Sequence, residues 1–426
     1  MHTRYARTRN FFDAGRVYWI KWLSLPSEIN LKTMRKIGIL LALLATLNIN
    51  SYATAQEVNK SGFNLIVVGD SQPQTKKQLA ELEDVIIPQI GVIVEEYRAT
   101  GLPTAILITG DVVWDTMRFL PRVKHAFESL GVPVYAVIGN HDHNKRHTRN
   151  QQRAEQNFTN TFGPRNQSFE LGETLFVTFD NIDYTAFSGY GEEIDSKQLI
   201  WLSELMEQTP HNKRIAVCMH ASATDFNSGK LKPYIKPLVS ILDGREIHFI
   251  TGHRHHHDTA DISESIVEHN VAQVNGNLWY APIGSDGMPR GVFCIEERNG
   301  VWQWQHRILG ESRDKQLVLY PMHRVKEHEE YVVVKVIGWD DKWRVDWSEN
   351  GEWRGAMEQI EILDPDYIYY VDNEANYSKK YMERLRKSAH THKHYFRCKP
   401  TMENSEITIT ATDRFGRTFT TTIKAE

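Results

Sequence analysis

The sequence predicts an α/β domain followed by a smaller β-rich domain. From residue 63 to about 308, apolar strand-like runs alternate with segments of helical periodicity, as in a sheet flanked by helices. Beyond about residue 310 the runs are mostly strand-like and separated by turn residues, which is typical of a sandwich of about a hundred residues. With 426 residues, the chain is long enough to build both cores.

The first 55 residues have the layout of an export signal with extra sequence before it. Met34-Arg35-Lys36 is basic, an apolar run follows, and Ala53-Thr54-Ala55 fits a small-x-small cleavage site. We expect a signal peptide over 34–55, cleaved before Gln56, and we interpret 1–33 as a start-site artefact. The apolar run is too short for a comfortable membrane span. The protein is therefore expected to be periplasmic or secreted from a bacterial cell without a transmembrane span; a retained anchor is the alternative.

The charge and the cysteine content exclude two classes of protein. Removal of residues 1–55 takes away eight of the 50 Lys and Arg and two of the 54 Asp and Glu, leaving a formal net charge near −10. General nucleic-acid binding through phosphate contacts is not expected at that charge. Three cysteines, odd in number and set in apolar or strand-like segments, do not form a disulfide framework.

In the α/β part, which we place at 56–309, strands and helices follow in turn. Helices are expected at 76–97, 121–130 and 196–208. Hairpin turns are expected at Gly172-Glu173, Asn275-Gly276 and Asn299-Gly300. Strands are expected at 63–69, 105–109, 132–139, 214–218 and 247–250.

In the β-rich part, which we place at 310–426, one helix is expected at 376–387. Turns are expected at Asn350-Gly351 and Phe415-Gly416. The strand-like segments are 331–339, 342–348, 367–371, 392–398 and 406–413.

Metal-binding side chains follow five of the strands in the α/β part. The carboxyl ends of neighbouring strands meet at one edge of an α/β sheet, so these side chains are expected to converge. They comprise two carboxylates, two amides and three imidazoles, enough to hold two metal ions. The candidate ligands are Asp70, Gln72, Asp111, Asn140, His220, His253 and His255.

This set of ligands suits the hydrolysis of phosphate esters. Two divalent ions about 3.5–4 Å apart neutralise the phosphoryl oxygens and lower the pKa of a bound water. A carboxylate can bridge two ions and an imidazole cannot, so Asp111 is expected to be the bridge. Asp70, Gln72 and His255 would hold one ion, while Asn140, His220 and His253 would hold the other.

The order of these motifs resembles that of the calcineurin-like metallophosphoesterases: D-x-H, G-D, G-N-H-D/E, H and G-H-x-H. The resemblance covers roughly 62–308 and implies a layered αββα core followed by a sandwich-like C-terminal domain. It also implies that His141 is catalytic, either as proton donor to the leaving group or as stabiliser of transition-state charge. Asp142 would orient that imidazole through a hydrogen bond.

Gln72 departs from the family pattern, which most often has His at this position. An amide oxygen is a harder and weaker ligand than imidazole, which favours Mn²⁺ or Mg²⁺ over softer metals. We therefore expect two divalent ions, with Mn²⁺ as the first choice and Fe, Zn or Mg as alternatives.

Two further segments stand out. Residues 281–291 are expected to form a tight loop, with Asp286 and Arg290 at the rim of the active site as the alternative. The segment resembles a D-G-x-P-x-G-Y stretch of exported bacterial phosphoesterases with an extra C-terminal domain, with Val292 in place of the Tyr. The cationic stretch 379–393 is expected to be a solvated face, with polyanion binding as the alternative.

Two functions follow from these observations. The first is an exported binuclear metallophosphoesterase that cleaves a phosphomonoester or phosphodiester by attack of a metal-bound hydroxide. The second is an envelope glycan- or lipid-binding protein with a structural or degenerate metal site. His141 favours the enzyme, since a structural site does not need it. Substrate selection is expected from loops 114–120, 143–162 and 221–231.

Overall fold

The structure is a computed structural model that describes residues 61–147, 149–184 and 189–425. The expected signal peptide and the segment before it lie outside these residues. None of the helices in the described ranges has the length and hydropathy of a membrane-spanning segment.

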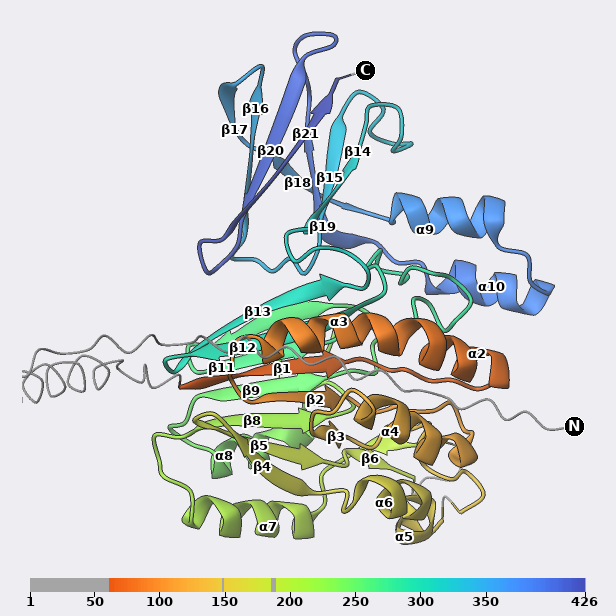
Figure 1. The fold of residues 1–426 in the computed structure, drawn as a ribbon, viewed down its shortest axis with the longest axis vertical. Helices are drawn as coiled ribbons and strands as arrows, with labels where there is room; N and C mark the ends of the chain where they lie inside the picture. Colours follow the sequence, from red (N-terminus) through yellow and green to blue (C-terminus); the bar gives the residue numbers. More distant parts are fainter. Residues whose placement is uncertain (1–60, 148, 185–188, 426) are drawn as a thin grey trace, which may run out of the picture. The chain divides into compact units, whose positions relative to one another are not determined.

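Two mixed sheets form the α/β part (Figure 1). The first has the strand order β13-β12-β1-β2-β3, and the second has the order β10-β11-β9-β8-β5-β4. The strands of the first are β1 (Gly62–Val68), β2 (Thr104–Ile108), β3 (Val134–Ala136), β12 (Gly291–Arg298) and β13 (Val301–Ile308). Those of the second are β4 (Gln167–Leu171), β5 (Thr174–Phe179), β8 (Arg214–Met219), β9 (Ile247–Thr251), β10 (Asp258–Ser263) and β11 (Ile266–Asn270). A short pair, β6 (Ile182–Asp183) and β7 (Gly191–Glu192), lies outside both sheets.

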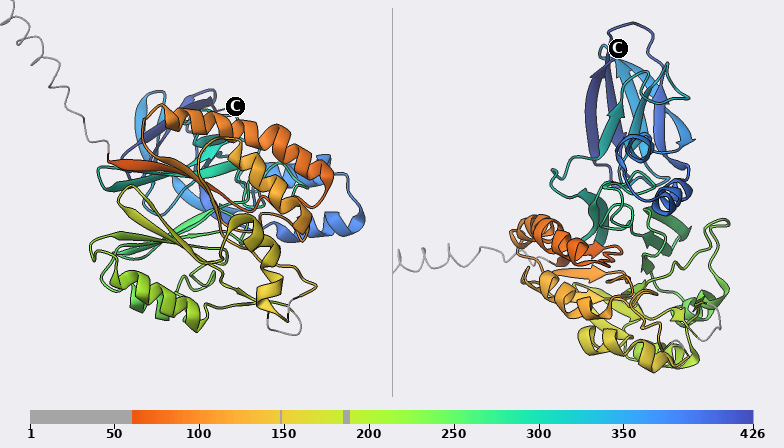
Figure 2. Two further views of the ribbon diagram at one scale, coloured as in Figure 1. Left: turned by 60° about the horizontal axis from the view of Figure 1, so that its bottom comes forward. Right: turned by 90° about the vertical axis from the view of Figure 1, so that its right-hand side faces the viewer.

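The side chains of β1 show how the layers are stacked. Phe63, Leu65 and Val67 pack in the core between the sheets, whereas Ile66 and Val68 pack in the core beneath the helices. Successive side chains of a strand point to opposite faces, so one strand serves both cores. Helices α2 to α4 cover one outer face, and α7 and α8 cover the other (Figure 2). The predicted αββα core is confirmed.

The helices of this part largely follow the predicted ranges. The helix expected at 76–97 is a run of three segments, with a wider π turn in the middle. The helices are α2 (Lys76–Glu81), η1 (Leu82–Ile86), α3 (Ile87–Arg98), η2 (Met117–Phe119), α4 (Leu120–Glu128), α5 (Gln151–Ala154), α6 (Gln156–Phe162), α7 (Ser196–Glu207), η3 (Pro233–Ile235) and α8 (Lys236–Ile241).

Two of the three predicted hairpins in this part are confirmed. Gly172 joins β4 to β5, and Asn299-Gly300 joins β12 to β13. The hairpin predicted at Asn275 is wrong. The Asn275 side chain instead donates to the carbonyls of Asp70 and Ser71, at 3.0 and 3.1 Å, and so ties a long loop to the end of β1.

The C-terminal part is a sandwich of two antiparallel sheets, as predicted. The first sheet has the order β14-β15-β19-β18 and the second the order β17-β16-β20-β21. Their bounds are β14 (Leu317–Tyr320), β15 (Val332–Val336), β16 (Arg344–Glu349), β17 (Glu352–Ala356), β18 (Glu358–Ile362), β19 (His392–Cys398), β20 (Glu406–Thr412) and β21 (Thr418–Lys424). Turns at Asn350-Gly351 and Phe415-Gly416 join strands as expected.

The strand predicted at 367–371 is wrong, because these residues are helical. Asp364 accepts a hydrogen bond from the Tyr367 N–H at 2.6 Å, and Pro365 occupies the first turn. An Asp cap followed by Pro starts a helix even where the next side chains are aromatic. The helices here are α9 (Pro365–Tyr369), η4 (Tyr370–Glu374) and α10 (Lys379–Ser388).

The domain boundary predicted at 309/310 falls in the connection between β13 and β14 and stays a prediction. The three cysteines, Cys218, Cys294 and Cys398, are buried and unpaired with one another, as the sequence predicts.

Candidate metal centre

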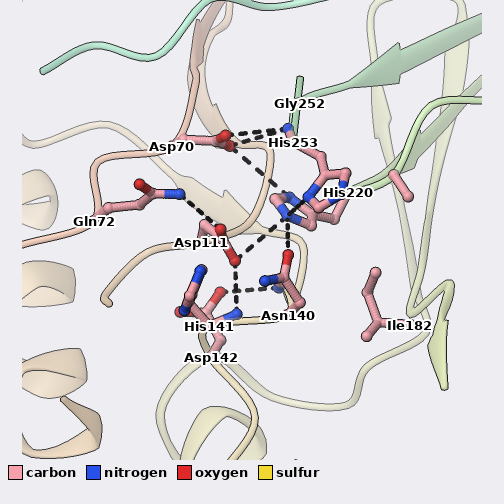
Figure 3. A network of polar contacts seen from close by, with 12 residues as sticks. Asp70, Gln72, Asp111, Asn140, His141, Asp142, Ile182, His220, Gly252 and His253 are labelled. Carbon is pink, nitrogen blue, oxygen red and sulfur yellow. Dashed lines mark hydrogen bonds and ion pairs between the residues drawn. The ribbon is translucent and has the colours of Figure 1, made fainter. Parts of the chain in front are cut away.

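The five segments with predicted ligands meet at one place (Figure 3). Asp70 follows β1, Asp111 follows β2 and Asn140 follows β3, and these three strands are parallel neighbours. His220 and His253 follow the parallel neighbours β8 and β9 of the other sheet. Both sheets thus bring the carboxyl ends of their strands to the same site.

Glycines before the ligands allow this close approach. A Cβ atom on Gly139 would lie 2.3 Å from Oδ1 of Asp111, and one on Gly110 would lie 2.5 Å from Nδ1 of His220. Both distances are far shorter than carbon–oxygen or carbon–nitrogen contacts allow. A side chain at either position would displace a candidate ligand.

Asp111, His220 and His253 form one group of candidate ligands, with one ligand atom each within 4.8 Å of the others. Nε2 of His220 lies 3.4 Å from Oδ1 of Asp111 and 3.1 Å from Nδ1 of His253. It also lies 3.0 Å from Oδ1 of Asn140. On the far side of the ring, Nδ1–H of His220 donates to the Thr109 carbonyl at 2.8 Å, which turns Nε2 toward the site.

Asp70, Asp111 and His255 form the second group, with ligand atoms again within 4.8 Å of one another. Nε2 of His255 lies 3.1 Å from Oδ2 of Asp70. The Gln72 amide nitrogen donates to Oδ2 of Asp111 at 2.7 Å and lies 3.1 Å from Nε2 of His255. Asp111 belongs to both groups, as a carboxylate that bridges two ions would.

Gln72 provides a test of whether the residues fit a metal. Its amide oxygen is buried and has no hydrogen-bond partner, which is costly for a polar atom. A half-turn of the amide would direct this oxygen, in place of the nitrogen, toward Asp111 and His255. The pair of buried carboxylates and the unpaired oxygen both fit a cation.

The electrostatics of the site also call for positive charge. Burial raises the pKa of Asp111, but attraction to the His220 ring outweighs it, and the pKa lies well below its usual range. Burial lowers the pKa of His220, but Asp111 outweighs this and raises it to about 10. Burial, with repulsion from His220, lowers the pKa of His253 to about 3. A metal ion bound at these carboxylates would supply the positive charge that Asp111 otherwise draws from the His220 ring.

The backbone at the site is strained. Asp70, Gln72, Asp111, His253 and His255 all have positive φ angles, between 25° and 68°. Residues other than glycine pay of order 1 kcal/mol or more for this conformation, and such strain clusters at functional sites. The backbone at the site is therefore less stable locally, and this conformation places the candidate ligands.

His141 is held by Asp115 rather than by Asp142. Nδ1 of His141 lies 2.9 Å from Oδ1 of Asp115, and Lys145 lies 2.8 Å from the same oxygen. Burial raises the pKa of Asp115, but the hydrogen bonds from His141 and Lys145 outweigh it and lower the pKa. The Trp114 ring stacks on His141, with 3.9 Å between ring centroids.

The predicted orienting role of Asp142 is wrong. Its carboxylate accepts hydrogen bonds from the backbone N–H groups of Val112, Val113 and Gly139, at 2.9–3.0 Å, and is fully buried. In this tight turn the side chain of Asp142 points away from that of its neighbour His141. Its hydrogen bonds hold the turns after β2 and β3 together. Burial, followed by repulsion from Asp111, raises the pKa of Asp142 to about 7.

Asp115→Asn is expected to slow the cleavage of esters with poor leaving groups about 10- to 100-fold, because it removes the negative charge that supports a protonated His141. A 4-nitrophenyl ester, whose leaving group needs little protonation, should be affected much less. Steady-state kinetics with an alkyl and a 4-nitrophenyl phosphate measure the difference. The assignment fails if Asp142→Asn changes this leaving-group dependence and Asp115→Asn does not.

Several residues around the site were not singled out as site residues from the sequence. Tyr184 donates to the Asn140 carbonyl at 2.5 Å, and Tyr190 places its hydroxyl 3.2 Å from Nε2 of His253. His143 is buried between the Gly139 carbonyl, at 2.9 Å, and Asp180, at 3.1 Å. Asp115 and Trp114 closely follow the Asp111 motif, and this proximity is the signal that could have found them.

Asp286 does not lie at the rim of the site. It is fully buried and accepts hydrogen bonds from the backbone N–H groups of His257 and Met288, at 2.8 and 3.0 Å. Arg290 pairs with Glu81 at 2.7 Å. The segment 281–291 is thus the tight loop that the sequence predicts.

Several solved structures are similar to this chain. The chain is similar to a dimetal phosphatase from Danio rerio, with 13% identity over 58% of this chain and 99% of that one, and a TM-score of 0.39. For the purple acid phosphatase PPD1 from yellow lupin seeds, identity is 12% over 60% of this chain and 52% of that one, with a TM-score of 0.44. For a 5′-nucleotidase from Candida albicans, identity is 11% over 58% of this chain and 52% of that one, with a TM-score of 0.38. The chain thus spans about half of the lupin and Candida proteins. No curated protein matches it.

Two family models match successive parts of the chain. Residues 63–257 match the calcineurin-like phosphoesterase, and residues 268–419 match the C terminal of calcineurin-like phosphoesterase. The second model begins inside the segment that we assigned to the α/β core. The chain therefore belongs to the calcineurin-like phosphoesterases and carries both the phosphoesterase domain and the C-terminal domain of that family.

Proposed function

We propose that this protein is an exported binuclear metallophosphoesterase that hydrolyses a phosphomonoester or phosphodiester. The observation that carries the proposal is that two groups of candidate ligands share Asp111. Two divalent ions bound there would neutralise the phosphoryl oxygens and supply a nucleophilic water of lowered pKa. Export is proposed from the sequence of 34–55 alone.

The chain's own residues supply the other functions of such a site. Asp70, Gln72 and His255 would hold one ion, and Asn140, His220 and His253 the other, with Asp111 between them. His141, supported by Asp115 at 2.9 Å, would donate a proton to the leaving group. The position of His141 beside the ligands favours an enzyme over a binding protein with a structural metal, which would have no use for this ring.

Hydrolysis of an aryl phosphate and its aryl diester with added Mn²⁺ tests the proposal. We expect turnover of at least one of the two esters and close to two metal equivalents by elemental analysis of protein purified without chelator. A fully active metal-free preparation would end the two-metal mechanism. Inactivity over a broad panel of esters would favour the glycan- or lipid-binding alternative.

Gln72→His is expected to raise affinity for Zn²⁺ more than affinity for Mn²⁺, because imidazole is a softer ligand than an amide oxygen. We expect the ratio of the two dissociation constants to change about tenfold, because substitution of the groups around a metal commonly changes metal affinity by at least that factor. Competition with a chromogenic chelator measures both constants. Gln208→His, at an exposed position after α7, controls for an added surface imidazole. An unchanged ratio would exclude Gln72 as a ligand.

A further inference from the structure

A pocket of about 250 Å³ lies beside the metal centre and is lined by residues from both parts of the chain. Gln72 and Trp114 come from the phosphoesterase part, and Lys380, Tyr381 and Arg384 come from α10 of the C-terminal part. Ten residues line it, of which four are aromatic, two are cationic and none is acidic. Its walls are therefore suited to an anion attached to an apolar or aromatic body.

Two of the lining residues connect this pocket to the site of the chemistry. Gln72 donates to the shared carboxylate Asp111 at 2.7 Å. Trp114 stacks on His141, the proposed proton donor, at 3.9 Å between ring centroids. The pocket thus lies beside the proposed proton donor, and a proton donor acts on the leaving group of a substrate.

The cations of the pocket differ from two other cations on the same helix, which lie near carboxylates. Lys380 and Arg384 are four residues apart and so share one face of α10. Elsewhere on this helix, Lys379 lies 4.0 Å from Glu383 and Arg386 lies 3.9 Å from Asp372. Among the described residues, no carboxylate lies within 4.0 Å of the charged groups of Lys380 or Arg384. Their charge is available to a ligand.

The neighbouring aromatic rings keep the side of the pocket made by α10 in place. The guanidinium of Arg384 lies 4.9 Å from the centre of the Trp114 ring. Tyr381 stacks on Tyr280, with 4.7 Å between ring centroids. A guanidinium over an indole ring is held by a cation–π interaction and keeps its N–H donors for a ligand.

The loop that carries Tyr280 is fastened to both parts of the chain. The Asn277 amide donates to the Tyr367 hydroxyl at 2.6 Å and to Ser388 at 2.8 Å. The Trp279 indole N–H donates to the Ser71 carbonyl, next to Asp70, at 2.9 Å. These hydrogen bonds hold α10 against the edge of the metal centre, so the cations have a fixed relation to it.

We propose that α10 makes this enzyme selective for phosphate esters whose leaving group carries a second phosphate, which Lys380 and Arg384 bind. The inference rests on the proposed function, whose substrate class it specifies. A guanidinium binds phosphate through paired hydrogen bonds, and an ammonium adds a second charge. The aromatic rings would pack against the body that links the two phosphates.

Binding of non-hydrolysable analogues to the manganese-loaded protein tests this inference without any need for turnover. Calorimetry at low ionic strength would compare α,ω-alkane bisphosphonates of increasing chain length with alkyl monophosphonates of equal length. A second arm uses a benzene-linked bisphosphonate, which separates aromatic leaving groups from aliphatic ones. We expect the best bisphosphonate to bind about tenfold more tightly than its monophosphonate, since charge-assisted hydrogen bonds are worth about that much.

Matched variants on the same helix complete the experiment. Lys380→Gln with Arg384→Gln should bring the ratio of the two affinities close to one. Lys379→Gln with Arg386→Gln removes the same charge from the helix outside the pocket and should keep the preference. The inference is overturned if the wild-type protein shows no preference, or if both double variants change it equally. Absence of turnover with every ester would instead count against the proposed function. The preference for the bisphosphonate is measured by binding alone, so the two failures can be told apart.

Discussion

Asp111→Asn is expected to lower kcat/KM for any ester the protein hydrolyses by on the order of 10³-fold. The carboxylate belongs to both groups of ligands, so its loss removes charge from two metal sites at once. Charge stabilisation by bound metals is worth several kcal/mol, and each 1.36 kcal/mol is a factor of ten in rate. Elemental analysis of the same samples should show fewer than two metal equivalents.

The control for this variant is Asp243→Asn, which makes the same chemical change at an exposed position. It should keep full activity and metal content. If Asp111→Asn binds two equivalents and turns over an ester at the wild-type rate, Asp111 is not the bridge and the two-metal site must be reassigned. Circular dichroism of both variants separates a lost metal from a lost fold.

Lys335→Met is expected to destabilise the protein by about 3–5 kcal/mol, the usual effect of leaving one partner of a buried ion pair without the other. Lys335 and Asp364 are both almost fully buried and lie 2.8 Å apart. The lysine also donates to the carbonyl of Gly287, in the loop 281–291, at 2.9 Å. Urea denaturation gives the change in the free energy of unfolding.

The companion variants show whether charge is the cause. Adding Asp364→Asn to Lys335→Met removes the uncompensated carboxylate and should recover part of the lost stability. Lys342→Met, at a side chain that is 58% exposed, should change stability by less than about 0.5 kcal/mol. A stability of Lys335→Met equal to wild type would show that the pair adds nothing to the folded state.

The Asp364 network also bears on the pocket. Asp364 caps α9 and accepts a hydrogen bond from the Tyr395 hydroxyl at 2.8 Å. It thus anchors the start of the helical segment that leads to α10 and the two cations of the pocket. The same cap starts the helix that replaces the strand predicted at 367–371. Asp364 thus bears both on that wrong prediction and on the position of the proposed pocket.

The fold and the candidate ligands could be predicted from the sequence because both depend on local signals. Apolar runs of strand length mark the sheets, and a polar residue directly after a run lies at its carboxyl end. Parallel strands bring those ends together whatever the loops between them do. Asp70, Asp111 and His220 could therefore be placed in one site although they are far apart in the chain.

The partner of His141 could not be predicted in the same way. Asp142 and Asp115 are both acids near the motif, and sequence proximity favours Asp142. Only the path of the turn decides, and it directs Asp142 inward to three backbone N–H groups and leaves Asp115 beside the ring. Spacing along the chain carries no information about the direction of adjacent side chains in a tight turn.

The sequence by itself determined the alternation of strands and helices in the α/β part, the C-terminal sandwich and the set of side chains that gather at the candidate metal centre, because these follow from periodicity and from strand ends. The αββα layering was implied by the resemblance to the family. Only the tertiary structure decided which acid supports His141 and which residues form the pocket beside it. Lys380 and Arg384 lie more than 300 residues from Gln72 in the chain. They line one pocket with Gln72 because of how the α/β part packs against the C-terminal part, and local sequence patterns do not predict such packing.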